Sequence, residues 1–237
     1  MYYIHIPSES ILDSAEDGSS GRHARYSTGS LMHRAQIKEL ARMSADIYDH
    51  KCGDFKAYAC NCDTNTEVAI YKRYGGYVVV FNGTDSASDW IDDIKYIPKA
   101  FAGLRVHKGF SDNVMSVMHT IESNVKRGDK VIFTGHSKGG AEAELASEYW
   151  LYKHGRLPIC VTFGMPAIFY DKHLNNSIRV VNEHDPVPRV GTRIGFKHAS
   201  KPYRIGRSPL YSGFLDILNP ARSYVSSHSI SEYIGNL

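Results

Sequence analysis

The chain has 237 residues, of which 42% are hydrophobic and 22% are charged, and its formal net charge is +3. These values are typical of a soluble globular protein with one sizeable core. Lys and Arg are spread along the chain instead of forming runs, which argues against nucleic acid as a partner. No segment reaches the roughly 18 uninterrupted apolar residues of a membrane-spanning helix, and no basic segment followed by an apolar run opens the sequence. We therefore expect a soluble protein, either cytoplasmic or released without a classical signal peptide.

The first 30 residues are expected to form a loose arm. Residues 8–30 are rich in Ser, Gly and charge and have few apolar residues at a regular spacing, so they cannot bury much surface. Residues 31–237 are expected to fold as one domain. Its first predicted element is a helix over residues 35–48, where apolar side chains recur at near-helical spacing and favour packing against one face of a sheet.

Three of the four cysteines follow this helix closely. Cys52, Cys60 and Cys62 lie just after His50, whereas Cys160 is far along the chain. The spacing lacks the paired C-x-x-C knuckles of structural zinc sites. We therefore expect reduced thiols and neither a metal nor a cofactor, and a zinc site is the alternative that this cluster leaves open.

The middle of the chain alternates strand-like and helix-like segments, which is typical of a largely parallel sheet with helices on both faces. The expected strands are short apolar runs rich in β-branched and aromatic residues, as in strands covered on both sides. These runs are residues 68–71, 77–81, 130–134, 159–163 and 178–181. Helical periodicity marks residues 111–125 and 139–152 as the elements that cross between strands. The predicted fold class is α/β.

One predicted strand runs directly into a G-x-S-x-G pattern. Residues 130–134 lead into Gly135, His136, Ser137, Lys138 and Gly139, and a helix-forming segment begins at once. A serine on such a sharp turn presents its hydroxyl above the edge of the sheet, and the flanking glycines avoid clashes within the turn. A structural serine in a Gly-rich turn is the alternative, but the strand and helix on either side favour a nucleophile.

A serine hydroxyl needs a base to accept its proton, and the base needs an acid to orient it. Asp185 follows the predicted strand 178–181 on a loop that contains two prolines. An Asp before Pro also commonly starts a turn. Its position after Ser137 and just past a strand nevertheless favours Asp185 as the orienting acid.

Two histidines beyond Asp185 are candidates for the base. His228 comes just before Ser229 and Glu232, which form a capping-box pattern, so His228 is expected on the loop that feeds a last helix. His198 lies in a basic stretch and is expected to be a surface residue. We therefore predict that His228 is the base.

Several motifs from about residue 78 onward resemble the class 3 lipase family, the fungal-lipase-like branch of the α/β hydrolases. They are residues 79–84, 89–93, 106–110, 135–139, 162–166 and 182–189. The resemblance implies the α/β-hydrolase fold and catalytic roles for Ser137, Asp185 and His228. It also implies an oxyanion hole around Gly83 and Thr84, with the amide of Lys138 as the second donor. From the residues alone, Thr84 is equally well explained as a turn-capping threonine.

The segment from Ser86 to Tyr96 corresponds to the lid of these lipases. It has the pattern of a short amphipathic helix, which either opens at a lipid surface or stays in place as a fixed cover. The family usually has Arg at the position of Asn82, facing a carboxylate that matches Asp93. That ion pair cannot form in this chain.

Three functions are compatible with the sequence. The leading one is hydrolysis of lipid carboxylic esters, in acylglycerols or phospholipids, through an acyl-enzyme on Ser137. The second keeps this chemistry but acts on a water-soluble ester. The third is a catalytically silent fold used as a binding module, against which the complete Ser-Asp-His order argues.

Overall fold

A seven-stranded sheet forms the centre of the computed structural model, which describes residues 3–4, 32–49, 53–84, 97–206 and 226–237. In sheet order the strands are β11 (Pro202–Ile205), β10 (Ile178–Asn182), β9 (Ile159–Phe163), β8 (Val131–His136), β5 (Gly76–Phe81), β4 (Thr66–Arg73) and β3 (Ala57–Asn61). Strands β5, β8, β9, β10 and β11 run parallel, whereas β3 and β4 are antiparallel to their neighbours. The sheet is therefore mostly parallel, as predicted.

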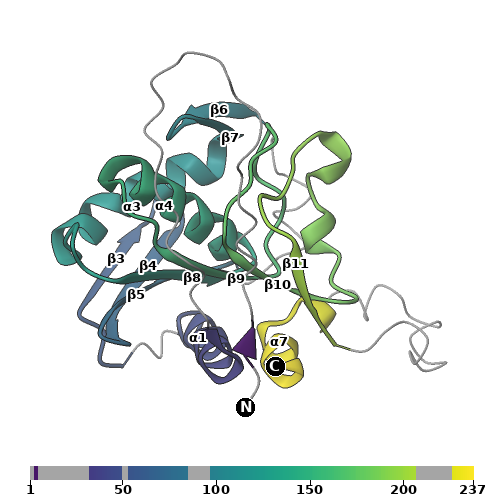
Figure 1. Cartoon of the computed structure of the whole chain (residues 1–237), viewed down its shortest axis with the longest axis horizontal. Coiled ribbons are helices and arrows are strands. Elements are labelled where there is room, and N and C mark those ends of the chain that lie inside the picture. The colour runs from purple at the N-terminus through teal and green to yellow at the C-terminus, as the bar shows by residue number, and fades with distance from the viewer. Residues whose placement is uncertain (1–2, 5–31, 50–52, 85–96, 207–225) are drawn as a thin grey trace.

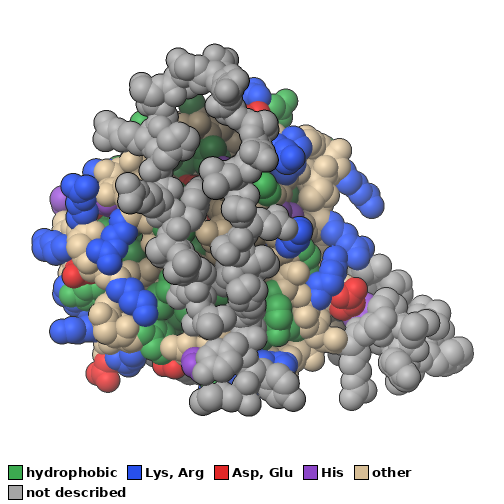
Figure 2. Space-filling view, in the orientation of Figure 1, with side chains coloured by type: hydrophobic (Ala, Val, Ile, Leu, Met, Phe, Trp, Pro, Cys, Tyr) green, Lys and Arg blue, Asp and Glu red, His purple; other side chains and the backbone are tan. Residues whose placement is uncertain are grey.

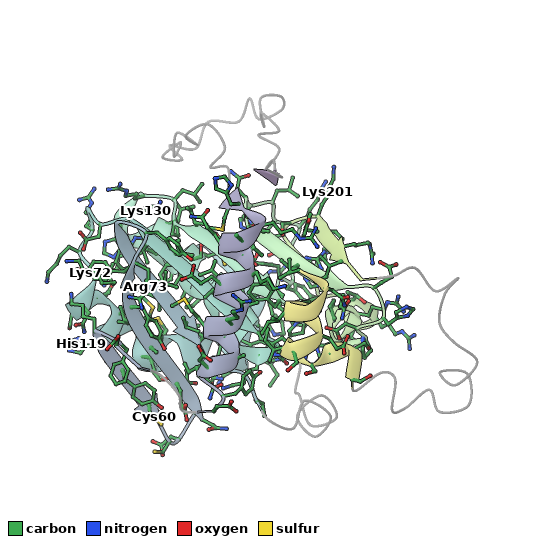
Figure 3. The ribbon with its side chains drawn as sticks, turned by 90° about the horizontal axis from the view of Figure 1, so that it is seen from below. Cys60, Lys72, Arg73, His119, Lys130 and Lys201 are labelled. Atoms are coloured by element: carbon green, nitrogen blue, oxygen red, sulfur yellow. The ribbon has the colours of Figure 1, made fainter. Side chains whose placement is uncertain are left out.

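Helices cover both faces of this sheet (Figure 1). On one face lie α3 (Lys108–Asn124) and α4 (Lys138–His154), and on the other lie α1 (Arg34–Asp46) and α7 (Ile230–Asn236). Figure 3 shows α1 and α7 next to each other on the same face of the sheet. The Arg34 guanidinium ties these two helices together, because it donates hydrogen bonds to the carbonyl oxygens of Asn236 at 2.8 Å and Leu237 at 2.9 Å. The predicted α/β class is confirmed.

The central strands are apolar on both sides because each side faces a helical layer. In β5, Val79 and Phe81 pack in the core under α3 and α4, whereas Val78 and Val80 pack in the core under α1 and α7. Each of these four side chains is fully buried. Strand alternation therefore builds two hydrophobic cores from one continuous apolar run.

The sequence predicted the central elements and missed those at the edges. All five predicted strands are present, and so are the helices predicted over residues 35–48, 111–125 and 139–152 and the last helix predicted after His228, with ends that differ by a few residues. The edge strands β3 and β11 were missed because they lack a run of β-branched and aromatic residues, and β3 alternates half-buried with exposed positions. Also unpredicted were β1 (Tyr3–Ile4), β2 (Met32–His33), β6 (Pro98–Phe101), β7 (Leu104–His107) and the 3₁₀ helices η1 (Val187–Arg189) and η2 (Thr192–Ile194).

Several predictions fall on residues outside the described ranges. These are the lid over residues 86–96, the His50 and Cys52 part of the cysteine cluster, and most of the N-terminal arm. Within the described ranges, Cys60 and Cys62 are exposed free thiols, and Cys160 is buried in β9. Figure 2 shows Lys and Arg side chains spread over both flanks of one face. Among the helices of these ranges, none is both long enough and apolar enough to cross a membrane.

Candidate active site

The G-x-S-x-G segment forms a tight turn between β8 and α4. Ser137 has φ 57° and ψ −124°, a strained conformation for a residue with a side chain. A Cβ added to Gly135 would collide with the backbone of Gly139, and one added to Gly139 would collide with the carbonyl oxygen of Phe81. Only glycine fits at both places, so the predicted strand–turn–helix context of Ser137 is present.

Asp185 and His228 form a buried pair at the same edge of the sheet. Asp185 lies three residues after β10, and His228 directly precedes Ser229, the N-cap of α7. The His228 Nδ1 is 2.8 Å from the Asp185 Oδ2, and the two residues are 5% and 3% exposed. Because a carboxylate only accepts, Nδ1 carries the hydrogen, and the neutral ring presents an unprotonated Nε2.

Hydrogen bonds between side chains and the main chain hold the segments around Asp185 and His228 in place. The Asn182 Nδ2 donates to the carbonyl oxygen of Ser227 at 3.1 Å, and the Ser227 Oγ donates to the carbonyl oxygen of His184 at 3.0 Å. The Val187 amide donates to the Asp185 Oδ1 at 2.9 Å. The geometry of the pair is therefore set by its loops as well as by its own hydrogen bond.

Tyr233, on α7, is a further partner of the acid. Its hydroxyl donates to the Asp185 Oδ2 at 2.5 Å, so this one oxygen accepts from both Tyr233 and His228. Burial, together with the nearby Asp185 carboxylate, raises the pKa of Tyr233 well above its usual value. Gly164 leaves the space for this arrangement, because an added Cβ would lie 2.7 Å from the Asp185 Oδ2 and 2.9 Å from the Tyr233 hydroxyl. No sequence pattern marked Tyr233, which only the fold brings to the acid.

His136, the residue that precedes Ser137, lies directly against His228. The rings of His136 and His228 are 4.5 Å apart between centroids, and the His136 Nε2 is 2.7 Å from the His228 carbonyl oxygen. The Ser137 Oγ and the His228 Nε2 are both buried, and neither has a hydrogen-bond partner within the described residues. These are the two atoms between which a serine nucleophile and its base exchange a proton.

The predicted oxyanion segment passes against the same turn. Thr84 lies three residues after the end of β5. A Cβ added to Gly83 would lie 2.9 Å from the carbonyl oxygen of His136 and would overlap the Tyr48 hydroxyl. Lys138, the first residue of α4, is 8% exposed. Gly83, which precedes Thr84, therefore lies against the turn that carries Ser137, and Lys138 directly follows the serine.

The Lys138 side chain belongs to a buried polar cluster with Asn65, Asn113 and Glu142. Its Nζ donates to the carbonyl oxygen of Asn65 and lies 3.2 Å from the Glu142 Oε1, which also accepts from the Asn113 Nδ2 at 2.7 Å. Burial raises the pKa of Glu142, and the nearby Lys138 opposes that rise. The ammonium group thus anchors the start of α4 to the turn between β3 and β4.

His198 is partly buried, so the prediction that it is a surface residue is wrong. Its neighbours Phe196 and Ala199 are each 2% exposed, so His198 is partly buried although Lys197 and Lys201 are exposed. The His198 Nε2 donates to the carbonyl oxygen of Pro188 at 2.7 Å. Burial, aided by the positive charge of Arg179, lowers the pKa of His198 to about 4.

Asn82 has a different partner from the one the family uses at this position. The Asn82 Nδ2 donates to the Glu67 Oε2 at 3.1 Å, which links the end of β5 to β4. Asp93 lies outside the described residues. Where the family has an Arg that pairs with a carboxylate of the lid, this chain has Asn82, which is hydrogen-bonded within the sheet.

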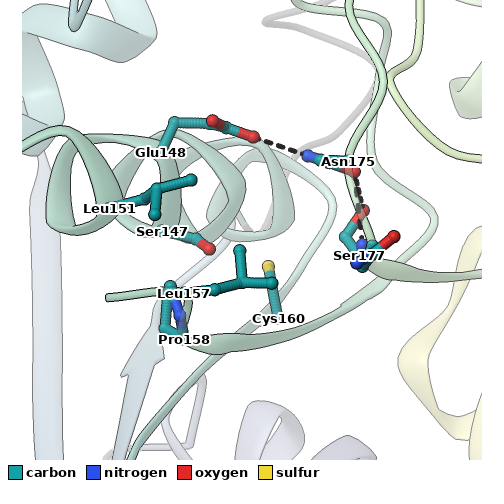
Figure 4. Close-up of a pocket in the computed structure, with 9 residues that line it drawn as sticks. Ser147, Glu148, Leu151, Leu157, Pro158, Cys160, Asn175 and Ser177 are labelled. Carbon is teal, nitrogen blue, oxygen red and sulfur yellow. Dashed lines mark hydrogen bonds between the residues drawn. The ribbon is translucent and has the colours of Figure 1, made fainter. Parts of the chain in front are cut away.

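A small cavity with both polar and apolar lining lies beside α4, away from the candidate site (Figure 4). It is lined by Ser147, Glu148, Leu151, Leu157, Pro158, Cys160, Asn175, Asn176 and Ser177. The Glu148 Oε1 accepts from the Asn175 Nδ2 at 2.7 Å, and the Asn175 Oδ1 accepts from the Ser177 Oγ at 2.9 Å. Its volume of about 10 Å³ has room for a single water and none for an acyl chain.

Known proteins are similar to this chain in both sequence and fold. Residues 78–194 match the family model described as Lipase (class 3). A lipase from Rhizomucor miehei is 32% identical over 169 residues, which are 60% of this chain and 45% of that protein. Secreted mono- and diacylglycerol lipase 1 from Fusarium solani is 31% identical over 150 residues, 56% of this chain and 45% of that protein. The chain thus spans about half the length of these curated relatives.

The solved structures give the same result. The Rhizomucor miehei lipase in its propeptide complex has a TM-score of 0.61 and 25% identity, covering 73% of this chain and 70% of that chain. A mutant form of MDLA from Penicillium cyclopium has a TM-score of 0.62 and 19% identity, covering 73% of this chain and 80% of that chain. The α/β-hydrolase fold is therefore confirmed. Residues 78–194, just under half of the chain, are similar to the class 3 lipase family, which confirms the predicted resemblance.

Proposed function

We propose that the protein is a serine carboxylic-ester hydrolase that cleaves acyl esters of lipids, acylglycerols or phospholipids, through an acyl-enzyme on Ser137. One observation carries the proposal. The His228 Nδ1 is bound to Asp185 at 2.8 Å, while the His228 Nε2 and the Ser137 Oγ are buried and have no partner among the described residues. A buried polar atom without a partner is costly, and such atoms are typical of sites that bind or react.

In the proposed mechanism, the Ser137 Oγ attacks the ester carbonyl carbon while its proton passes to the His228 Nε2. Asp185 holds the His228 ring in the required tautomer and stabilises the imidazolium. The amides of Thr84 and Lys138 stabilise the negative charge on the tetrahedral oxygen. His228 then gives its proton to the departing alcohol, and a water activated by the same histidine releases the fatty acid.

Lipid esters are the proposed substrates because the matched relatives are lipases. The Fusarium solani relative is a mono- and diacylglycerol lipase. The match of residues 78–194 to the class 3 lipase family model supports the same substrate class. A lid over residues 86–96 that contacts a lipid surface is part of this proposal.

The test is product analysis after incubation with mixed acylglycerols and phospholipids, beside a short p-nitrophenyl ester. Wild type is expected to release fatty acid from the lipids. Ser137→Ala is expected to lose about a thousand-fold or more of the activity on every ester, because it removes only the attacking oxygen. Ser123→Ala, which removes an exposed hydroxyl on α3, is the matched control and should keep full activity. Hydrolysis of the short ester without lipid hydrolysis would overturn the lipid substrate, and near-normal turnover by Ser137→Ala would overturn the mechanism.

A further inference from the structure

Two residues outside the proposed triad connect α1 to the main chain of His228. Tyr48 lies just after α1, and its hydroxyl is 2.9 Å from the His136 Nδ1. The other ring nitrogen of His136 is 2.7 Å from the carbonyl oxygen of His228. His136 itself is 4% exposed. The three residues thus form a continuous hydrogen-bonded chain from a covering helix to the proposed base.

The carbonyl oxygen at one end fixes the direction of the hydrogen bonds in this chain. A carbonyl oxygen only accepts, so the His136 Nε2 must carry the hydrogen. In the neutral ring the Nδ1 is then unprotonated and accepts from the Tyr48 hydroxyl. The carbonyl oxygen of His228 therefore selects the Nε2–H tautomer of His136. The Tyr48 hydroxyl, which can donate or accept, donates to the remaining Nδ1 and supports that tautomer.

The surroundings also keep His136 uncharged. Burial, reinforced by the nearby His228, holds the pKa of His136 well below its usual value. The ring centroids of the two histidines are only 4.5 Å apart. A charged His136 would disfavour the His228 imidazolium that forms during ester hydrolysis, because like charges at this distance repel.

The Tyr48 hydroxyl lies against the proposed oxyanion segment too. A Cβ added to Gly83 would overlap this hydroxyl, so the Gly83 backbone passes directly over the phenol oxygen. Tyr48 therefore contacts the segment that precedes Thr84 and, through His136, the backbone of His228. One phenol links two parts of the site that are far apart in sequence.

We propose that Tyr48 and His136 are positioning residues, which fix the backbone of His228 so that its ring meets Ser137 in a single orientation. This proposal rests on the proposed function. Asp185 anchors the His228 ring at Nδ1, and His136 anchors the same residue at its carbonyl oxygen. Two anchors fix the direction of the ring, which one hydrogen bond leaves free to pivot.

The kinetic test is Tyr48→Phe, which removes one hydroxyl and keeps the ring. We expect kcat and kcat/KM to fall together by about 10- to 100-fold with little change in KM, because misplacing a catalytic group weakens only the transition state. Tyr74→Phe is the matched control, since the Tyr74 hydroxyl donates to Glu39 of α1 at 2.6 Å. It should leave kcat unchanged. Equal kcat values for Tyr48→Phe and wild type, at unchanged Tm, would overturn the proposal.

A spectroscopic test does not depend on activity. Nitrogen-15 NMR of labelled histidines should show His136 as the neutral Nε2–H tautomer at neutral pH, with an Nδ1 resonance that shifts in Tyr48→Phe because its hydrogen bond is lost. A neutral Nδ1–H form or an imidazolium in the wild type would overturn the proposal. If the wild type hydrolyses no ester, the proposed function has failed, and the tautomer of His136 alone decides whether the hydrogen-bonded chain exists.

Discussion

At the scale of single residues, the two candidate histidines differ in what their nitrogens contact. The His228 Nδ1 is bound to Asp185 and its Nε2 has no partner among the described residues. The His198 Nε2 is bound to the Pro188 carbonyl oxygen, and burial lowers its pKa to about 4. His198 is therefore neutral at the pH of the assay and is engaged elsewhere.

The first prediction compares these two histidines by substitution. His228→Ala should lower kcat/KM by about a thousand-fold or more and remove the rise of kcat/KM with pH, because a general base must be neutral to accept the Ser137 proton. His198→Ala should keep both. The measurement is kcat/KM against pH for the two variants, each checked for folding by circular dichroism. An active His228→Ala beside an inactive His198→Ala would move the base to His198.

The second prediction concerns Gly164, which has φ 60° and lies against Asp185. Gly164→Ala should lower kcat/KM by about 10- to 100-fold, since its Cβ would displace the acid that orients His228. Gly155→Ala is the control, because Gly155 has φ 65° but no atom within 4 Å of an added Cβ. Both variants should lose about 1 kcal/mol or more of unfolding free energy from backbone strain. An equal loss of activity in both would show that strain, and not the position of Asp185, is responsible.

At the scale of elements, α4 gains its stability from the face that packs on the sheet. Trp150 is fully buried against Phe133 of β8, with ring centroids 6.1 Å apart, whereas Tyr152 is 68% exposed. Trp150→Ala should lower the unfolding free energy by about 3–5 kcal/mol through the cavity it creates. Tyr152→Ala should change it by less than about 0.5 kcal/mol. Urea denaturation of both variants checks this third prediction, and similar losses would contradict the assigned faces of α4.

The position of each strand in the sheet explains which strands could be predicted from the sequence. Central strands such as β5 and β8 are continuous apolar runs because both faces are covered, so a local pattern was enough. The edge strand β3 contains no β-branched residue and alternates half-buried with exposed positions, so no pattern marked it. Ser137, Asp185 and His228 each sit next to a recognisable local motif. Tyr48, His136 and Tyr233 act through contacts between residues far apart in sequence, which no local spacing encodes.

At the scale of the whole molecule, buried histidines link stability to pH. The pKa of His198 is lowered to about 4 in the folded protein, below the value of about 6.5 expected when unfolded. The unfolded chain therefore binds the proton first as the pH falls. The stability that neutral His198 provides is complete above about pH 6.5 and is lost as the pH falls from about 6.5 to about 4.

The fourth prediction follows from this linkage. Between pH 7 and pH 5, His198→Gln should lose about 1–2 kcal/mol less unfolding free energy than the wild type does, since Gln does not titrate. Its amide can still donate to the Pro188 carbonyl oxygen. Urea denaturation at the two pH values gives the comparison. Identical pH dependence in the two proteins would mean that His198 is not buried in its neutral form.

The most direct test of the central proposal is to locate the nucleophile chemically. A fluorophosphonate reacts with a serine only when that serine is activated by a base and lies in an accessible site. We expect one adduct per chain, found by peptide mass spectrometry on Ser137, and no adduct in Ser137→Ala. A protein that hydrolyses esters but carries the adduct on another residue, or carries none, would contradict the account.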